Sequence, residues 1–248
     1  MIIFSHTSAA GPEARQPGAL CSQALQFDSL KFGFPGIRAR YRDRPGRRLR
    51  FIDPFSCELV DFGTPLRYEN WLLRRFDPAA VYLDASEDAF EVLHRGKQLT
   101  FRPHLHWAEL LNKGVLEFVV EPGRGLASED VERLEVVARA HGLSSSLRPA
   151  SEIRRDTKLL DFLDRTRQML VMHLSSMRNE DVQCAVLELV NGRECLTRAD
   201  LLSALVQEGD GLSEAGIDAV LFWLRQSGAL EFDIEGGRYG DHTAISST

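Results

Sequence analysis

The middle of the chain alternates between short runs with apolar residues at every second position and longer runs with apolar residues at helical spacing. Residues 48–53 and 57–62 predict two short strands joined at Pro54. A helix follows from Pro65, because the fixed φ of proline suits a first helical turn, and it ends at the turn 76–78. This part of the chain therefore opens with two strands and one helix.

Further strands are predicted after that helix. Runs at 90–93 and 99–106 flank Gly96 and predict a hairpin, and 115–121 predicts another strand. In both 99–106 and 115–121, polar side chains alternate with apolar ones and so share one face of each strand. We expect these two polar faces to look into one cleft.

The next segments complete a mixed sheet with flanking helices. Ser128 begins a helix that Gly142 stops, residues 143–147 form a last strand, and a long amphipathic helix runs from Ser151 to about Met177. The order strand, helix, strands, helix, strand predicts an α/β domain in which helices flank a mixed sheet.

The end of the chain has a different pattern. Apolar residues in 182–189 predict one helix, Thr197 with Asp200 three positions later begins a second, and 213–228 holds a third. Residues 230–239 resemble a small hairpin around two glycines. Three short helices with a terminal hairpin describe a winged helix.

These patterns divide the chain into four parts. Residues 1–26 lack periodicity and are rich in Gly, Pro, Ser and Ala, which predicts a flexible tail. The mixed α/β domain then spans 27–155, a connecting helix spans 156–178, and the winged helix spans 179–248. With 44% hydrophobic and 27% charged residues in 248, the composition is that of an ordinary globular protein.

The net charge of −6 conceals an asymmetry along the chain. From Asn179 onward, thirteen acidic residues face four arginines, a charge of −9, so the preceding residues carry +3. One basic run stands out, with a single opposing residue, Asp43; its members are Lys31, Arg38, Arg40, Arg42, Arg44, Arg47, Arg48 and Arg50. Such density suits DNA phosphates, and the other interpretation is a set of arginines that solubilise a linker.

Other features narrow the class of protein. No apolar stretch approaches the roughly 18 residues of a membrane span, and the first residues lack the pattern of a secretory signal, so we expect a cytoplasmic protein. Four cysteines show no CxxC spacing, which indicates neither a zinc cluster nor a disulfide framework and favours buried or inert thiols. They are Cys21, Cys57, Cys184 and Cys195.

Several short motifs occur in a fixed order within the mixed α/β domain. A helix carries Leu66-Arg67-Tyr68-Glu69 and leads into Phe76-Asp77-Pro78, and two strand ends read Arg102-Pro103-His104 and Val119-Val120-Glu121-Pro122. The segments Arg139-Ala140-His141-Gly142 and Pro149-Ala150-Ser151-Glu152-Ile153-Arg154 follow. In order and spacing these pieces resemble the TnsA family of transposon-end endonucleases, which implies a restriction-endonuclease-like fold followed by a C-terminal winged helix.

The resemblance also implies a nuclease site, and most of its residues are replaced. Glu69 matches the family's metal-binding glutamate, whereas His104 stands at the aspartate, Val119 at the glutamate or glutamine, and Glu121 at the lysine. Carboxylate oxygens hold the Mg²⁺ in such a site, and neither imidazole nor valine replaces them. The usual mechanism is then unavailable, and we expect a catalytically inactive protein without a cofactor.

A working site is the alternative interpretation. Glu69, His104 and Glu121, with His106, form a mixed ligand set for Mn²⁺ or Zn²⁺, and an active enzyme would use Mg²⁺ or Mn²⁺. Against it stands the ordinary interpretation of these residues as solvated polar side chains on strands and a helix surface.

The charge of the winged helix bears on the partners. Its third helix presents Glu214 and Asp218 and only Arg225 opposite them, so a phosphate surface would repel it and a protein partner is favoured. The resemblance implies a transposase and an AAA+ ATPase regulator as partners, besides DNA. The leading hypothesis is therefore a DNA-associated assembly subunit of a transposition complex. An active metal-dependent endonuclease and a winged-helix transcriptional regulator are the alternatives.

Overall fold

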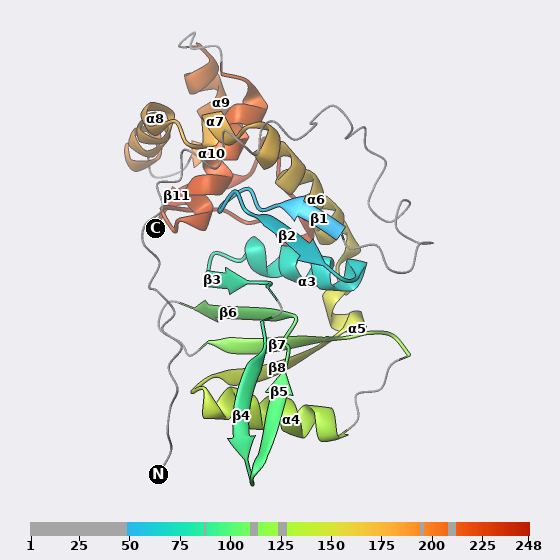
Figure 1. The fold of residues 1–248 in the computed structure, drawn as a ribbon. Coiled ribbons are helices and arrows are strands. Elements are labelled where there is room, and N and C mark those ends of the chain that lie inside the picture. The colour runs from blue at the N-terminus through green and yellow to red at the C-terminus, as the bar shows by residue number, and fades with distance from the viewer. Residues whose placement is uncertain (1–48, 87, 110–113, 124–127, 194–195, 208–211) are drawn as a thin grey trace.

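The computed structural model describes residues 49–86, 88–109, 114–123, 128–193, 196–207 and 212–248. The predicted tail 1–26 and most of the basic run lie outside the described residues. Only Arg50 among the seven predicted DNA-binding arginines falls within them. The chain is a mixed α/β protein in which a sheet and its helices lie below a mainly helical C-terminal part in the view of Figure 1.

The main sheet has four strands in the order β3-β6-β7-β8. Its strands are β3 (Ala80–Asp84), β6 (Leu105–Glu109), β7 (Val115–Val120) and β8 (Ser144–Pro149). The first three run antiparallel, and β8 runs parallel to β7. Helix α4 (Ser128–Ala140) makes the connection between the two parallel strands, as a parallel pair requires.

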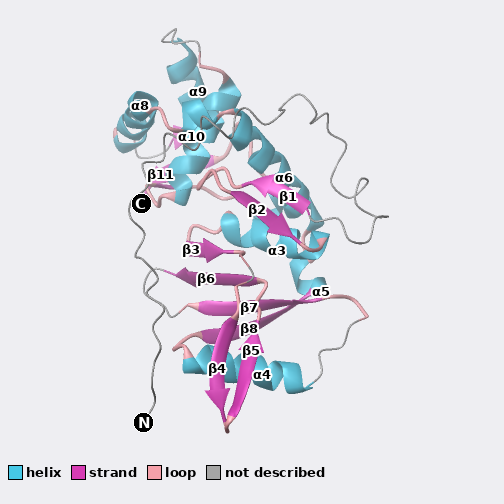
Figure 2. Cartoon of the chain, viewed as in Figure 1, coloured by secondary structure: helices cyan, strands magenta, loops and turns pink. Residues whose placement is uncertain are grey.

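Helices cover both faces of this sheet (Figure 2). Successive strand side chains point to opposite faces, so Leu116 and Val119 of β7 mark the two sides. Leu116 packs against buried residues of α4, whereas Val119 packs with Leu66 of α3 (Pro65–Arg75) and Ile153 of α5 (Ala150–Ile153). Residues 65–75 therefore form the helix that the sequence predicted, and it covers the face opposite α4.

Two small antiparallel ribbons accompany the main sheet. One pairs β1 (Leu49–Ile52) with β2 (Leu59–Phe62), close to the predicted bounds. The other pairs β4 (Phe90–His94) with β5 (Lys97–Phe101) across Arg95 and Gly96, both at positive φ, as tight hairpins require.

The predicted continuous strand 99–106 is wrong. It is divided between β5 of the ribbon and β6 of the main sheet, and the division falls at Arg102–His104. Pro103 has no N–H to continue a ladder, which accounts for the break. Strand β3 was not predicted at all, although it is the edge of the main sheet.

The predicted single helix from Ser151 to Met177 is also wrong, because this segment forms three helices. They are α5, α6 (Thr157–Met172) and α7 (Leu174–Met177). Asp156 begins α6 as its N-cap, and its side chain accepts a hydrogen bond from the N–H of Leu159 at 2.9 Å. His173 separates α6 from α7.

The C-terminal part consists of three helices and a small three-stranded sheet of order β10-β11-β9. In chain order its elements are α8 (Glu180–Asn191), β9 (Leu196–Thr197), α9 (Arg198–Gln207), α10 (Glu214–Gln226), β10 (Leu230–Glu231), the 3-10 helix η2 (Glu235–Gly237) and β11 (Ala244–Ser247). Asp200 and Thr197 exchange hydrogen bonds at the start of α9, and Ser213 caps α10, as predicted.

The hairpin prediction for 230–239 is wrong in its second strand. Gly236 and Gly237, at φ of 63° and 70°, belong to the 3-10 helix rather than to a tight turn. The strand that pairs with β10 is β11, several residues further along.

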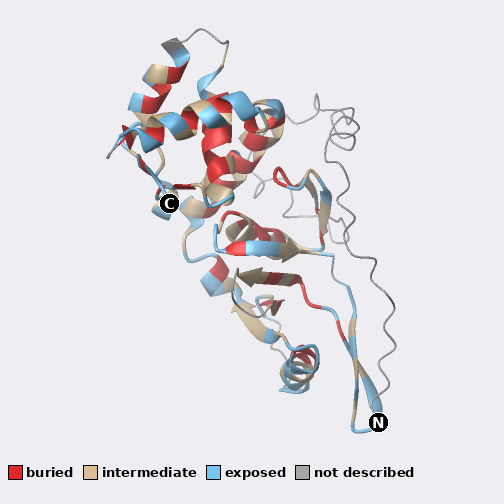
Figure 3. Cartoon of the chain, turned by 90° about the vertical axis from the view of Figure 1, so that its left-hand side faces the viewer, coloured by how far each residue is buried: buried red, intermediate tan, exposed pale blue. Residues whose placement is uncertain are grey.

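One hydrophobic cluster joins the α3 region to the C-terminal part. It includes Trp71 and Leu72 of α3, Leu170 of α6 and the interior of α10. Figure 3 shows α10 as an almost continuously buried helix, and eight of its residues are buried. Within the described residues, no helix is long and apolar enough to cross a membrane.

Candidate functional site

The residues singled out by the resemblance lie around helix α3 and the strand β7 beneath it. Thr64 caps α3, with its hydroxyl accepting from the N–H of Arg67 at 3.3 Å, and Pro65 follows at the first turn. This start fixes which side chains of α3 face the sheet. Glu69 and Asn70 are buried polar side chains of α3, and Arg74 lies one turn after Asn70. All three side chains form hydrogen bonds with charged partners.

Glu69 is bound by an arginine. Its side chain is 10% exposed, and Arg154 donates from Nε to Oε2 at 2.6 Å and from Nη2 to Oε1 at 3.3 Å. Arg154 directly follows α5, so the closing segment of the domain brings this guanidinium onto α3. Both carboxylate oxygens thus accept charge-assisted hydrogen bonds from one planar group, the strongest arrangement for such a pair.

His104 is buried between strands rather than open to solvent. Its Nδ1 accepts a hydrogen bond from the backbone N–H of Val119 at 3.0 Å, and its ring stacks on Phe118 with centroids 4.0 Å apart. Burial first, and then the positive charge of Arg67, lower the pKa of His104 to about 3. At neutral pH the imidazole is therefore uncharged, with its proton on Nε2.

Glu121 lies immediately after β7 and reaches the start of α3. Its Oε1 accepts a hydrogen bond from the hydroxyl of Thr64 at 2.6 Å. Glu121 is therefore held at the helix start through the residue that caps α3.

The structure places all three predicted residues against α3 or β7, yet not as a metal cage. Among the described residues, no group of three or more His, Cys, Asp and Glu side chains has an arrangement that could hold a metal ion. His106 does not join the three, because its ring packs against Tyr82 and Phe90, with centroids 5.0 and 5.6 Å away. Burial lowers the pKa of His106, and Asp84 partly opposes this shift.

The sequence analysis placed Glu117 on the polar face of 115–121 and did not predict that it is a buried charge. Its side chain is fully buried; Asn70 donates to Oε1 at 2.5 Å and Arg74 to Oε2 at 2.9 Å. The guanidinium of Arg74 also lies 4.0 Å above the ring of Trp107. The expected shared cleft is not formed at Glu117, because α3 covers this face of β7. The sequence signal for this clamp was the spacing of Asn70 and Arg74, one helical turn apart.

Arg50 is the one predicted DNA-binding residue that the structure describes. Its Nε lies 2.8 Å from Oδ1 of Asp61 across the β1-β2 ribbon, and its side chain is 65% exposed. The pairing is a surface ion pair that leaves the guanidinium accessible to solvent.

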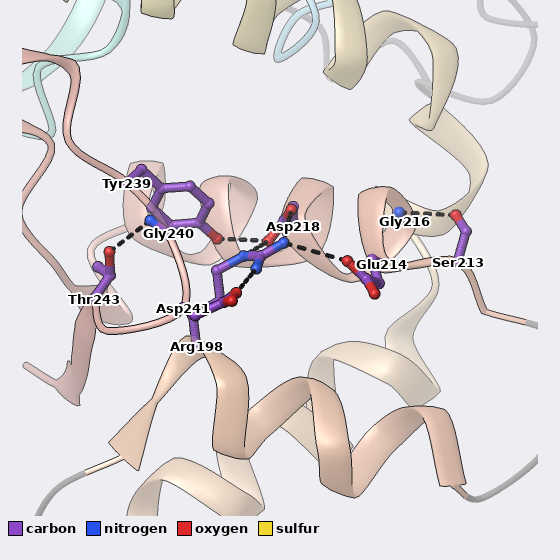
Figure 4. Close-up of polar contacts among 9 residues, drawn as sticks. All are labelled: Arg198, Ser213, Glu214, Gly216, Asp218, Tyr239, Gly240, Asp241 and Thr243. Atoms are coloured by element: carbon purple, nitrogen blue, oxygen red, sulfur yellow. Dashed lines mark hydrogen bonds and ion pairs between the residues drawn. The ribbon is translucent and has the colours of Figure 1, made fainter.

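A second polar cluster lies within the C-terminal part (Figure 4). Arg198, at the start of α9, donates from Nε and Nη2 to the two oxygens of Asp218, both at 2.8 Å, and from Nη1 to Asp241 at 2.7 Å. Tyr239 donates its hydroxyl to Asp218 at 2.7 Å. Burial and Asp218 raise the pKa of Tyr239, and the hydrogen bonds with Asp218 raise the pKa of Arg198. This network ties α9, α10 and the segment before β11 together.

The prediction that α10 presents Asp218 and Arg225 at its surface is wrong. Asp218 is only 8% exposed because it is paired with Arg198. Arg225 donates to the carbonyl oxygens of Phe76 at 2.8 Å and Phe232 at 3.0 Å, and burial lowers its pKa. Glu214 remains exposed, with its side chain 72% accessible. Helix α10 therefore carries internal contacts where a recognition helix would carry external ones.

The remaining cysteine prediction concerns two described residues. These are Cys57 and Cys184. Cys57 is half-buried and accepts a hydrogen bond from Nη2 of Arg178 at 3.0 Å, whereas Cys184 is exposed on α8. Cys21 and Cys195 lie outside the described residues.

No known protein family matches this chain, and no curated protein is similar to it at a significant level.

Proposed function

We propose that the protein is a DNA-associated subunit of a heteromeric transposition complex, with a restriction-endonuclease-like domain that does not cut DNA. The observation that carries the proposal is the ion pair between Glu69 and Arg154, with both carboxylate oxygens engaged. The resemblance assigns metal binding to this glutamate. A bidentate arginine occupies the oxygens that a divalent cation would need.

The arrangement of elements supports the proposed nuclease-like fold. A helix, three antiparallel strands, a second helix and a parallel strand follow one another as α3, β3, β6, β7, α4 and β8, with the β4-β5 ribbon between β3 and β6. Glu69 lies on the helix, His104 just before β6 and Glu121 just after β7, in the order that the resemblance implies. The order of elements and of residues therefore supports the proposed fold, while the residues themselves depart from the nuclease chemistry.

The chemistry of the replaced residues supports a non-cleaving role. Val119 offers no ligand, and Nδ1 of His104 already accepts a backbone hydrogen bond. Glu121 stands where the family has a lysine and carries the opposite charge. Mg²⁺ needs several oxygen ligands in octahedral geometry, and its catalytic use in phosphodiester hydrolysis depends on them.

The C-terminal part supports a contact with protein rather than with DNA. Its three helices and its small sheet, in which β10 pairs with β11, support a winged helix. Its third helix is mostly buried, so a regulator that inserts this helix into a DNA groove is disfavoured. Among its described residues, nine acidic side chains are exposed against two arginines, Arg193 and Arg238. The acidic ones are Glu180, Asp181, Glu188, Asp200, Glu214, Glu231, Asp233, Glu235 and Asp241.

The DNA-binding part of the proposal is tested by the salt dependence of affinity. Fluorescence anisotropy on a labelled duplex should give a dissociation constant that rises with salt, with a log–log slope of about 0.9 for each phosphate contacted. Replacing Arg38, Arg40, Arg42 and Arg44 together by alanine should reduce the slope by about 3 to 4.

The matched control replaces Arg193 and Arg238, which are exposed on the acidic C-terminal part. Their alanine variant should bind DNA with an unchanged slope. DNA binding that is absent, or that is equally strong in the fourfold variant of the basic run, would refute the assignment of this run to DNA.

A further inference from the structure

A groove separates the β1-β2 ribbon from the main sheet. Residues of β2 line one wall, residues of β3 line the other, and α3 forms the floor with Arg67, Trp71 and Arg75, spaced four apart along one side of the helix. Its volume is about 950 Å³, at the upper end of the range for ligand sites. This volume is large enough for a short segment of a polymer.

Both walls are strand edges rather than strand faces. Side chains on one face recur at every second position, so a wall made by a face would include alternate residues. Here consecutive residues line the groove, from 81 to 86 on the β3 side and from 58 to 61 on the β2 side. Strand β3 is the outermost strand of its sheet, and β2 has β1 as its neighbour in a two-stranded sheet. Edges of this kind offer backbone N–H and C=O groups to an added strand.

The edges that face the groove are unusually apolar for a protein surface. Among the described residues, six large hydrophobic side chains are well exposed, and three of them line this groove. They are Leu59 at 63%, Val81 at 58% and Tyr82 at 46%. Exposed apolar groups gathered at one place indicate an interaction surface.

The charge of the groove is negative. It continues into a smaller pocket that shares Tyr82, Asp84 and Ser86 with it. Together the two are lined by three arginines, Arg67, Arg75 and Arg102, and by five carboxylates: Asp53, Glu58, Asp61, Asp84 and Asp88. Asp53 is paired with Arg75 and Asp61 with Arg50, so Glu58, Asp84 and Asp88 carry the excess negative charge over Arg67 and Arg102. Asp84 accepts hydrogen bonds from the N–H and hydroxyl of Ser86 and from the hydroxyl of Tyr82, all of which are neutral donors. A basic side chain fits this end.

We propose that the groove binds an extended, basic segment of a partner protein as an additional β-strand between β2 and β3. Backbone hydrogen bonds to the two edges supply affinity, alternate apolar side chains meet Leu59 and Val81, and basic side chains meet the carboxylates. The added strand joins the two-stranded ribbon to the four-stranded sheet as one continuous sheet over α3. This proposal is independent of DNA binding and of the state of the nuclease-like site.

Peptide binding to the full chain tests it. The probe is a fluorescent eight-residue peptide in which valine alternates with lysine and threonine. We expect saturable binding, and at least tenfold weaker binding to the variants Leu59→Lys and Val81→Lys, because each places a cation on an edge. Both side chains are more than half exposed, so the variants should remain folded.

The control variant is Leu93→Lys, which alters an equally exposed leucine, 74% accessible, on the β4-β5 ribbon outside the groove. It should bind the probe as the unmodified protein does. Two control peptides, one with glutamate in place of lysine and one with proline at its centre, should bind at least tenfold more weakly. Hydrogen exchange should show new amide protection in β2 and β3 on binding.

Several results would overturn the proposal. These are absence of probe binding, equal binding to Val81→Lys, or protection confined to other elements. Self-association of the free protein that Val81→Lys abolishes would assign the edges to a second copy of this chain. Displacement of the probe by a duplex without protection of β2 and β3 would assign the groove to nucleic acid.

Discussion

Acidification should destabilise the protein through His104, and the size of the effect follows from its surroundings. The pKa of this imidazole is about 3 in the folded chain, against 6.5 for an unperturbed histidine, because burial and Arg67 disfavour the cation. Between these two values the unfolded chain binds a proton that the folded chain does not. The stabilisation is therefore complete above pH 6.5 and declines as the pH falls toward 3.

The expected magnitude is large for one side chain. Well inside this window each pH unit lowers the free energy of unfolding by about 1.4 kcal/mol, and the slope is about half of that at pH 6.5, so His104 alone accounts for a loss of about 2 kcal/mol between pH 6.5 and pH 4.5. This is a sizeable fraction of the 5–15 kcal/mol that typically stabilises a domain. Only 8% of the residue is exposed, so solvent does little to screen the effect.

Urea denaturation at a series of pH values measures the contribution of His104 to the free energy of unfolding when the protein is compared with a His104→Asn variant. The asparagine carbonyl oxygen takes the place of Nδ1 as acceptor for the N–H of Val119 and does not titrate. Other titrating groups contribute to both proteins alike, so the difference between the two pH slopes isolates His104. Equal slopes in the two proteins between pH 6.5 and pH 4.5 would refute the buried, neutral histidine.

Three further predictions concern stability and cooperativity. Asp218→Ala should lower the free energy of unfolding by about 3 kcal/mol in urea denaturation, because it leaves Arg198 without its bidentate partner. Asp241→Ala should lower it by no more than about 1 kcal/mol, because the side chain of Asp241 is 69% exposed. Equal losses in the two variants would contradict the burial of Asp218. Gly237→Ala should be about 2 kcal/mol more destabilising than Gly96→Ala. Both glycines have positive φ, but only at Gly237 would the added Cβ lie 2.9 Å from a backbone oxygen of α6. A lower melting temperature for Gly96→Ala than for Gly237→Ala would contradict this. The shared hydrophobic cluster predicts one unfolding transition, seen alike by tryptophan fluorescence and far-ultraviolet circular dichroism, and two separated transitions would show independent units.

The elements predicted best from the sequence were those with local start and stop signals. The helix from Pro65, the capping pair Thr197 and Asp200, and the N-cap Ser213 all occur as predicted. In each case one short segment contains the groups that satisfy the free backbone donors of a first helical turn, so no distant contact decides the outcome.

The errors arose where a local break was overlooked, as at Pro103 and Asp156, or where distant contacts decide. Periodicity gave no reason to divide 99–106 between two sheets, nor to break 151–177 into three helices. The burial of Glu117 depends on two α3 side chains that reach it from more than forty residues away in the sequence. A strand pattern records which residues share a face; it does not record what covers that face.

The same contrast between local signals and distant contacts applies to the candidate site. Order and spacing assigned Glu69 to a helix and His104 and Glu121 to strand ends, whereas their partners came only from the fold. Arg154 on Glu69 and the hydroxyl of Thr64 on Glu121 are contacts across 85 and 57 positions of sequence. Such pairings follow from tertiary packing, which local propensity does not specify.

Strand cleavage tests the central claim most directly. Purified protein is incubated with supercoiled DNA that carries transposon ends, in Mg²⁺ and in Mn²⁺, alone and with the transposase, and nicked and linear products are quantified on gels. The account predicts no product above that of the DNA and transposase without this protein, because the oxygens of Glu69 are held by Arg154. Cleavage that depends on this protein and is lost in Glu69→Ala would contradict the account.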